Sequence, residues 1–326
     1  MNLDWMDFDT WPLGANITAI AATMVIVALG AHWVVEAAAR LAKRFGVSEL
    51  VIGLTVVAAG TSAPEFAVTL IAAFRGQGDI SVGNIVGSNI FNLGFILGGC
   101  AMVRAIPIDR TLLWRDGTIL ALTTILLLGL VGIDLELGRL DGLVLFGLLL
   151  VYLGYLFVKR HAIPGTEEEV ETLVADGDSL WWNCFLLVFG LAFILGGSHL
   201  LIGSSTTVAR TFGVSEWLIG VTIVAAGTSA PEFATSLVGV IRGKYGISAG
   251  NIIGSDLFNL LGVLGLAGML RPVAIDPVSR VSLVALAGLV FATLVFMRTG
   301  WRISRFEGLL LVALSFLVFY LSAAGH

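Results

Sequence analysis

The sequence predicts an all-α membrane protein of about ten transmembrane helices, in two inverted five-helix repeats with helices broken near the midplane of the bilayer. Three observations lead to this prediction: the composition, the apolar runs and an exact internal repeat. Hydrophobic residues make up 57% of the 326-residue chain and charged residues only 13%. Because soluble domains carry about 25% charged residues, the composition excludes an ordinary water-soluble domain.

Ten apolar runs approach the ~20 residues that a helix needs to cross a bilayer. Five precede the most polar stretch of the chain and five follow it. We expect transmembrane helices at about 15–38, 50–74, 80–103, 112–131, 140–158, 180–208, 216–241, 247–270, 279–297 and 305–323. The sequence therefore predicts a multi-pass protein.

The two halves of the chain are copies of one unit. Residues 60–67 recur letter for letter as residues 227–234, 167 positions later (227 − 60). The similarity extends without a gap over the motif regions 46–98 and 213–265. We therefore predict a first five-helix repeat over 1–158, an acidic linker over 159–179 and a second five-helix repeat over 180–326.

Five crossings per unit is an odd number, so the second unit must enter the membrane from the opposite side. Such inverted repeats are typical of secondary transporters. The positive-inside rule favours both termini outside and the linker inside. With that orientation, 13 of the 18 Lys and Arg residues lie in inner loops: Arg40, Lys43, Arg44, Arg104, Arg110, Arg115, Lys159, Arg160, Arg242, Lys244, Arg298, Arg302 and Arg305.

Each repeat contains a proline followed by a glutamate inside an apolar run. Pro64 has no N–H group and collides with the preceding turn, so we expect the helix to break near 59–62 and to free backbone carbonyls. Such groups must be satisfied by the protein or by a cavity. The carboxylate of Glu65 follows the break directly. The neighbouring hydroxyls and the second copy of the set are Thr61, Ser62, Thr228, Ser229 and Glu232.

An inverted repeat brings the two breaks together near the bilayer midplane, so we expect Glu65 and Glu232 to meet there. Two carboxylates among neutral oxygens form a site for a hard cation. The next helix of each repeat adds a polar stripe at i, i+4 and i+8, which is close to one helix face. Such side chains can also join helices by hydrogen bonds. The stripe consists of Asn84, Ser88 and Asn92, and of Asn251, Ser255 and Asn259.

Together these motifs resemble a known family. Residues 60–65 read GTSAPE and residues 83–92 read GNIVGSNIFN, and both motifs return in the second half as 227–232 and 250–259. They resemble the two α-repeats of the cation/calcium antiporter superfamily, and most closely those of prokaryotic sodium/calcium exchangers. The resemblance covers nearly the whole chain, with all ten predicted spans in order.

The resemblance implies a ten-helix fold whose central site holds one Ca²⁺ or several Na⁺ in alternation. On matched positions, Glu65 and Glu232 would bind calcium. For sodium, the resemblance implies additional hydroxyl ligands from Thr61, Ser62, Ser88, Thr228, Ser229 and Ser255. It also implies backbone carbonyl ligands near Ala58 and Ala225. Asn92 and Asn259 would occupy the remaining central position.

Two departures from the family pattern concern charge. Some relatives have aspartate at one or both positions matching Asn92 and Asn259, a difference that bears on potassium dependence, whereas both are amides here. The second repeat also has Asp256 where the first has Asn89. Asp256 is a possible further site charge, a residue of the access path or a protonated packing donor, and we expect one of the last two.

The resemblance predicts a secondary active antiporter that exchanges Na⁺ for Ca²⁺, not an enzyme. Proton/calcium exchange, with Glu65 and Glu232 carrying protons, and potassium-dependent exchange stay open. A passive cation channel, with the two breaks as its filter, is the alternative from another class. We expect Ca²⁺ and Na⁺ as substrates in the plasma membrane of a prokaryote. The lipid bilayer is the expected surrounding. We expect no cofactor, no nucleic acid and no obligate protein partner.

Overall fold

The computed structural model describes residues 8–76, 78–159, 179–213, 225–274 and 279–324. The described part is all-α, apart from four strands of two residues each. The helices of the first half are η1 (Phe8–Thr10), α1 (Leu13–Phe45), α2 (Glu49–Ile52), η2 (Gly53–Val57), α3 (Ala58–Thr61), α4 (Ala63–Arg75), α5 (Gly78–Ile90), η3 (Phe91–Leu97), α6 (Gly98–Val103), η4 (Leu112–Gly117), α7 (Thr118–Asp134) and α8 (Arg139–Lys159).

The second half repeats this order where it is described. Its helices are α10 (Leu180–Thr211), α12 (Ala225–Thr228), α13 (Ala230–Ile241), α14 (Tyr245–Leu257), η6 (Phe258–Val263), α15 (Leu264–Leu270), α16 (Ser279–Arg298), η7 (Thr299–Trp301) and α17 (Arg305–Ala324). Four segments, η2, η3, η4 and η6, are π-helical turns that continue from or into an α-helix. The predicted linker lies outside the described residues, except at its two ends.

The helices confirm a multi-pass membrane protein. Among the described residues, seven helices are long and apolar enough to cross a membrane, or eight if the bent pair Glu49–Thr61 and Ala63–Phe74 is one span. Helices cover the predicted ranges, and the range 216–241 is helical from Ala225 onward, with a break at Ser229.

Two short antiparallel pairings join the loops of the two halves. Strand β1 (Ile106–Pro107) pairs with β4 (Arg302–Ile303), and β2 (Glu136–Leu137) pairs with β3 (Val273–Ala274). The pattern is reciprocal, because β1 and β3 occupy equivalent positions in the two halves (273 − 106 = 167). Each pairing therefore fixes a loop of one half against a loop of the other.

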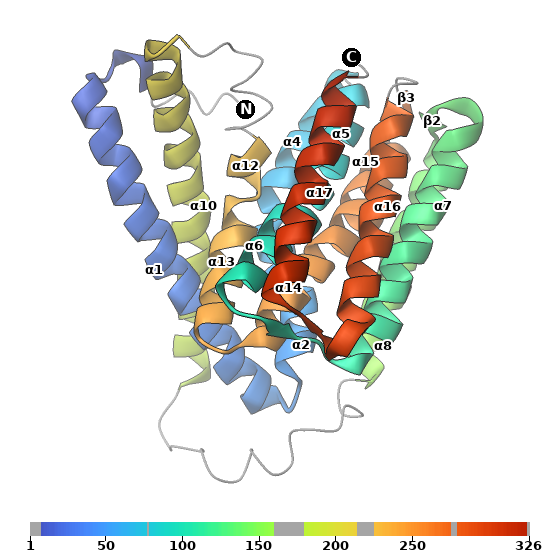
Figure 1. Cartoon of the computed structure of the whole chain (residues 1–326), viewed down its shortest axis with the longest axis horizontal. Helices are drawn as coiled ribbons and strands as arrows, with labels where there is room; N and C mark the ends of the chain where they lie inside the picture. The colour runs from blue at the N-terminus through green and yellow to red at the C-terminus, as the bar shows by residue number, and fades with distance from the viewer. Residues whose placement is uncertain (1–7, 77, 160–178, 214–224, 275–278, 325–326) are drawn as a thin grey trace.

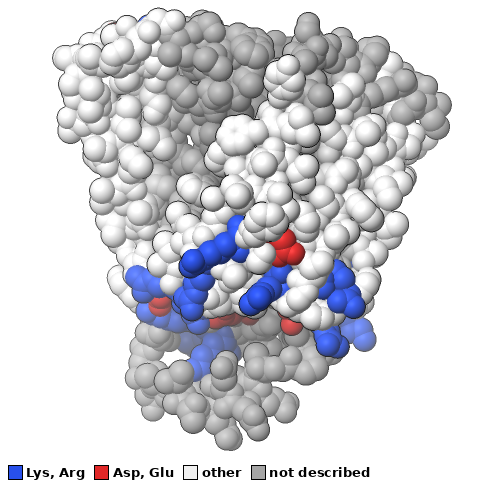
Figure 2. Space-filling view, in the orientation of Figure 1, with Lys and Arg blue, Asp and Glu red and all other residues white. Residues whose placement is uncertain are grey.

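The direction of the chain differs between the halves. Figure 1 shows that α1 begins and α17 ends at the same end of the molecule, whereas α8 ends and α10 begins at the opposite end. On the face drawn in Figure 2, the described Lys and Arg side chains gather at this second end. The chain therefore crosses to the basic end in its first half and returns in its second half.

Helices α1 and α10 form a pair beside the bundle made by the other helices (Figure 1). A small apolar core joins the pair to the bundle and includes Ala31 of α1, Ile194 of α10 and Ile247 of α14. Gly30 and Gly190 lie at the crossing: a Cβ atom added to either would come within 2.8 Å of the carbonyl oxygen of the other. Glycine lets two membrane helices approach this closely.

The bundle depends on a similar contact between α6 and α17. A Cβ atom on Gly98 would lie 2.7 Å from the carbonyl oxygen of Gly308, whereas one on Gly99 would meet no described atom within 4 Å. We expect Gly98→Ala to destabilise the protein by about 1–3 kcal/mol, the usual cost of overpacking, and Gly99→Ala to change stability little. Thermal unfolding in detergent measures both variants, and equal melting temperatures would contradict the packing described here.

Candidate cation site

Each repeat breaks where the sequence predicts. Ser62 separates α3 from α4 with φ −77° and ψ 8°, and the two parts of the span meet at an angle of 50°. Ser229 separates α12 from α13 with φ −88° and ψ 8°. Because proline cannot continue the hydrogen-bond ladder but fits the first turn of a helix, Pro64 and Pro231 start the second part of each span.

The two breaks place both glutamates deep inside the protein. Glu65 and Glu232 lie in the first turns of α4 and α13, and neither has any exposed surface. The N-terminal end of a helix carries a partial positive charge, which favours a carboxylate. The halves also exchange hydrogen bonds: Ser62 Oγ donates to Glu232 Oε1 at 2.9 Å, and Ser229 Oγ donates to Glu65 Oε1 at 3.1 Å.

The polar stripes of α5 and α14 complete the surroundings of the carboxylates. Ser88 Oγ donates to Glu65 Oε1 at 3.4 Å, and Ser255 Oγ donates to Glu232 Oε1 at 3.3 Å. The Oε1 atom of each glutamate thus accepts two hydrogen bonds, one from a serine of its own repeat and one from a serine of the other repeat. The pattern orients both carboxylates across the interface between the halves.

The first asparagine of each stripe joins two neighbouring helices by a hydrogen bond. Asn84 Nδ2 donates to Thr69 Oγ1 at 3.0 Å, which joins α5 to α4. Asn251 Nδ2 donates to Ser236 Oγ at 3.0 Å, which joins α14 to α13. Asn251 Oδ1 also accepts the hydroxyl of Thr61 at 3.0 Å. These two asparagines therefore hold the helices that carry the glutamates.

The last asparagine of each stripe is held by its amide nitrogen. Asn92 Nδ2 donates to Asp256 Oδ1 at 3.0 Å, and Asn259 Nδ2 donates to Asn89 Oδ1 at 3.0 Å. Asn89 and Asp256 are repeat equivalents (256 − 89 = 167), and both are fully buried. Asn89 was not among the residues predicted for the site, although its equivalence to Asp256 was a sequence signal for it.

Several buried oxygens at the centre have no hydrogen-bond partner among the described residues. They are Glu65 Oε2, Glu232 Oε2, Asn92 Oδ1, Asn259 Oδ1 and Asp256 Oδ2. All are acceptors when the carboxyl groups are ionised. Burying unpaired polar atoms is costly. Acceptor oxygens cannot hydrogen-bond to one another, but all of them can coordinate a cation. The donor set suits a hard cation, because oxygen is the ligand that Na⁺ and Ca²⁺ share.

The remaining predicted residues lie at the breaks. Thr61 is buried and its hydroxyl also lies 3.3 Å from Ala58 O. Ala58 O also accepts the N–H of Ser62 at 3.0 Å. Thr228 is buried at the end of α12, the helix that begins at Ala225. No group of three or more His, Cys, Asp or Glu residues that could hold a metal occurs in the described part.

Both halves of the chain match one known protein family. The sequence model of the sodium/calcium exchanger protein family matches residues 16–158 and again residues 182–324. The chain belongs to the sodium/calcium exchanger protein family. The two matched segments cover most of the chain, one in each half.

Several relatives within and around this exchanger family match this chain over most of their own length. The putative antiporter CaxA of Alkalimonas amylolytica is 38% identical over 89% of this chain and 92% of its own. The inner membrane protein YrbG of Escherichia coli is 35% identical over 85% and 87%. The sodium/calcium exchanger MaX1 of Methanosarcina acetivorans is 29% identical over 94% and 99%.

The fold also matches a solved exchanger. A structure of the sodium-calcium exchanger NCX_Mj, soaked with Na⁺ and Ca²⁺, superimposes with a TM-score of 0.80 at 29% identity, covering 93% of this chain and 97% of that one. The fold, the family and the antiporter names of its relatives confirm the predicted resemblance. CaxA and MaX1 are named as an antiporter and an exchanger, which is consistent with the expectation of a protein that is not an enzyme.

Proposed function

We propose that this protein is a secondary active antiporter that exchanges Na⁺ for Ca²⁺ by alternating access at a central carboxylate site. One observation carries the proposal: two fully buried glutamates, one from each half, accept serine hydroxyls from both halves through one oxygen and keep the other oxygen unpaired among the described residues. The exchanger names of MaX1 and NCX_Mj support the choice of ions.

Glu65 and Glu232 are the proposed calcium ligands, and the hydroxyls around them join for sodium. The hydrogen bonds between the serines and the glutamates support this assignment, because a hydroxyl that reaches a carboxylate also reaches an ion bound to it. The other proposed oxygens come from Thr61, Ser62, Ser88, Asn92, Thr228, Ser229, Ser255 and Asn259 and from the carbonyls of Ala58 and Ala225.

The proposed architecture is ten transmembrane helices in two inverted repeats. The family match in each half and the opposite chain direction of the halves in Figure 1 support it. The basic end in Figure 2 is the proposed inner side, since inner loops carry an excess of Lys and Arg. Both termini would then lie outside the plasma membrane of a prokaryote.

Charge balance explains why such a site would exchange ions without leaking. Two carboxylates ~4 Å apart repel each other by about 4 kcal/mol at an effective dielectric constant near 20, and their desolvation costs several kcal/mol more per ion. An empty site would therefore oppose closure on both sides. One Ca²⁺, or two or more Na⁺, offsets the charge of the two glutamates, so the protein would change state only when loaded.

An inverted duplication within one chain favours this mechanism over a passive channel, because channels usually place several subunits around an axis normal to the membrane. Proton/calcium exchange and potassium-dependent exchange would use the same two carboxylates. They differ in the driving ion. Uptake of ⁴⁵Ca²⁺ into proteoliposomes loaded in turn with Na⁺, K⁺ or acidic buffer separates the three.

We expect Glu65→Gln and Glu232→Gln each to abolish Na⁺-driven ⁴⁵Ca²⁺ uptake, because each change removes half of the glutamate charge that offsets calcium dehydration. Glu136→Gln, which changes an exposed glutamate in strand β2, is the control and should transport normally. Thermal unfolding in detergent shows whether the variants are folded. Near-normal flux in either site variant would refute the assignment.

Potassium should not be needed for transport. Asn92 and Asn259 are neutral, so the glutamates alone supply the proposed formal charge, and the site has no additional carboxylate at these two positions to balance K⁺. We expect a Na⁺ gradient to drive calcium uptake in K⁺-free buffer on both sides. An absolute requirement for K⁺ in the same proteoliposomes would contradict this expectation.

Asp256 should matter through its oxygen more than through a charge. Asp256→Asn keeps an acceptor for the amide of Asn92, as Asn89 does for Asn259, so we expect less than a several-fold change in calcium flux and an unchanged response to membrane potential. Asp256→Leu removes the acceptor and should lower flux further. If the wild type ignored an imposed valinomycin potential and Asp256→Asn responded to it, Asp256 would instead be a charged ligand.

A further inference from the structure

A groove on the outer surface of the bundle lies between α7 and α8 and has a volume of about 410 Å³. Its walls are mainly apolar, with Leu122 and Leu126 on α7 and Leu148 and Val151 on α8. Leu122 and Val151 are 60% and 70% exposed, so the groove opens to the surroundings. Both helices are long and apolar enough to cross the membrane, so the groove faces lipid.

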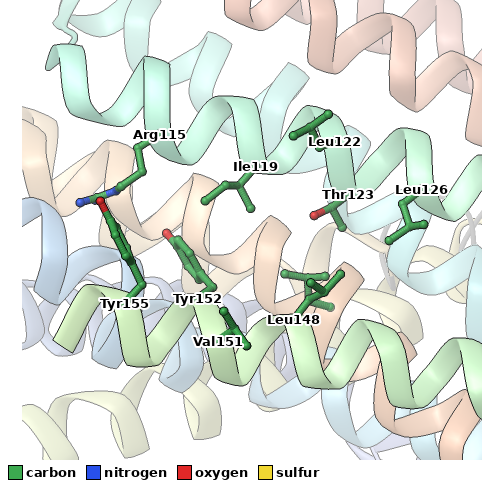
Figure 3. Close-up of a pocket in the computed structure, with 10 residues that line it drawn as sticks. Arg115, Ile119, Leu122, Thr123, Leu126, Leu148, Val151, Tyr152 and Tyr155 are labelled. Carbon is green, nitrogen blue, oxygen red and sulfur yellow. The ribbon is translucent and has the colours of Figure 1, made fainter. Parts of the chain in front are cut away.

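One end of the groove is polar. Figure 3 shows the guanidinium of Arg115 beside the hydroxyl of Tyr155 at this end, away from the leucines. Arg115 donates to buried Asp116 through Nε at 2.7 Å and Nη2 at 3.0 Å, and Tyr152 donates to the same carboxylate at 2.9 Å. A guanidinium has five N–H donors. Three of them are thus left without a partner among the described residues, and they lie next to the Tyr155 hydroxyl.

The groove has the dimensions of one membrane leaflet. At 1.5 Å per residue, the wall from Arg115 to Leu126 is about 16 Å long, close to half of the ~30 Å hydrocarbon core. Arg115 lies only three residues after the start of η4, so the polar end is at the headgroup level of the basic side. Lys159, one turn after Tyr155 on α8, is exposed at the same end and adds positive charge.

We propose that this groove binds an anionic phospholipid of the inner leaflet, with one acyl chain between α7 and α8 and the phosphate on Arg115 and Tyr155. Arginine N–H groups and a hydroxyl are suitable donors for phosphate oxygens. Asp116 fixes the guanidinium but also balances its charge, so Lys159 supplies the preference for an anionic headgroup. The acyl chain would pack on Leu261 of η6, the segment that also carries Asn259.

Native mass spectrometry of the purified full chain tests this binding without measuring transport. The micelles contain phosphatidylglycerol, phosphatidylethanolamine and phosphatidylcholine in equal amounts with identical acyl chains. We expect the wild type to retain one phosphatidylglycerol in preference to the other two. Retaining phosphatidylglycerol no better than phosphatidylcholine would overturn the proposal.

Variants of the groove have matched controls on the same helices. Val151→Trp fills the groove and should abolish retention, whereas Leu150→Trp, on another face of α8 and 56% exposed, should keep it. Leu122→Trp tests the other wall if Val151→Trp fails to fold, with Ile125→Trp as its control. Equal retention by a folded groove variant and its control would overturn the proposal.

The headgroup contact has its own variant. Tyr155→Phe leaves the groove and the pair of Arg115 with Asp116 intact and removes one hydrogen bond to a charged group. We expect phosphatidylglycerol retention to fall roughly tenfold, the lower range for such a bond, and any phosphatidylcholine retention to fall with it, because both lipids carry the phosphate. Unchanged phosphatidylglycerol retention in Tyr155→Phe would exclude the proposed position of the phosphate.

Discussion

The burial of two carboxylates inside the membrane is the constraint on which the rest of the structure depends. Glu65 and Glu232 have no exposed surface, and a buried charge without partners costs several kcal/mol. The helix breaks, the serines at the breaks and the polar stripes all supply groups that make this burial tolerable. Each glutamate accepts a hydrogen bond from a serine of the other half. The carboxylates therefore obtain these hydrogen bonds only when the two halves are assembled.

Close helix packing makes these contacts possible. A Cβ atom on Gly250 or Gly254 would lie 2.7 Å from the carbonyl oxygen of Leu50 or Leu54, so α14 rests directly on the backbone of α2 and η2. This approach brings Ser255 within 3.5 Å of the hydroxyl of Thr61. Gly250 and Gly254 therefore permit the close contact through which the polar residues of α14 reach the first half.

The contacts of Asn92 and Asn259 are equivalent in geometry but differ in charge. Asn259 is held by an amide, Asn89, and Asn92 is held by a carboxyl group, Asp256, at the same distance of 3.0 Å. Both contacts use the amide nitrogen and leave the carbonyl oxygen of the asparagine unpaired among the described residues. A small difference between the repeats thus preserves the orientation of both asparagines, which is the property that an oxygen ligand needs.

The sequence by itself determined the lipid environment, the helix positions, the duplicated breaks and the oxygen-rich residues, because apolar run length, proline chemistry and helical spacing are local properties. Only the tertiary structure decided that Ser62 donates a hydrogen bond to Glu232 and that Asn89 orients Asn259. Only the tertiary structure also showed that Leu261 of the second half lines the groove between α7 and α8. These partners lie far apart in the chain, and their meeting depends on how the helices cross, which local spacing does not specify.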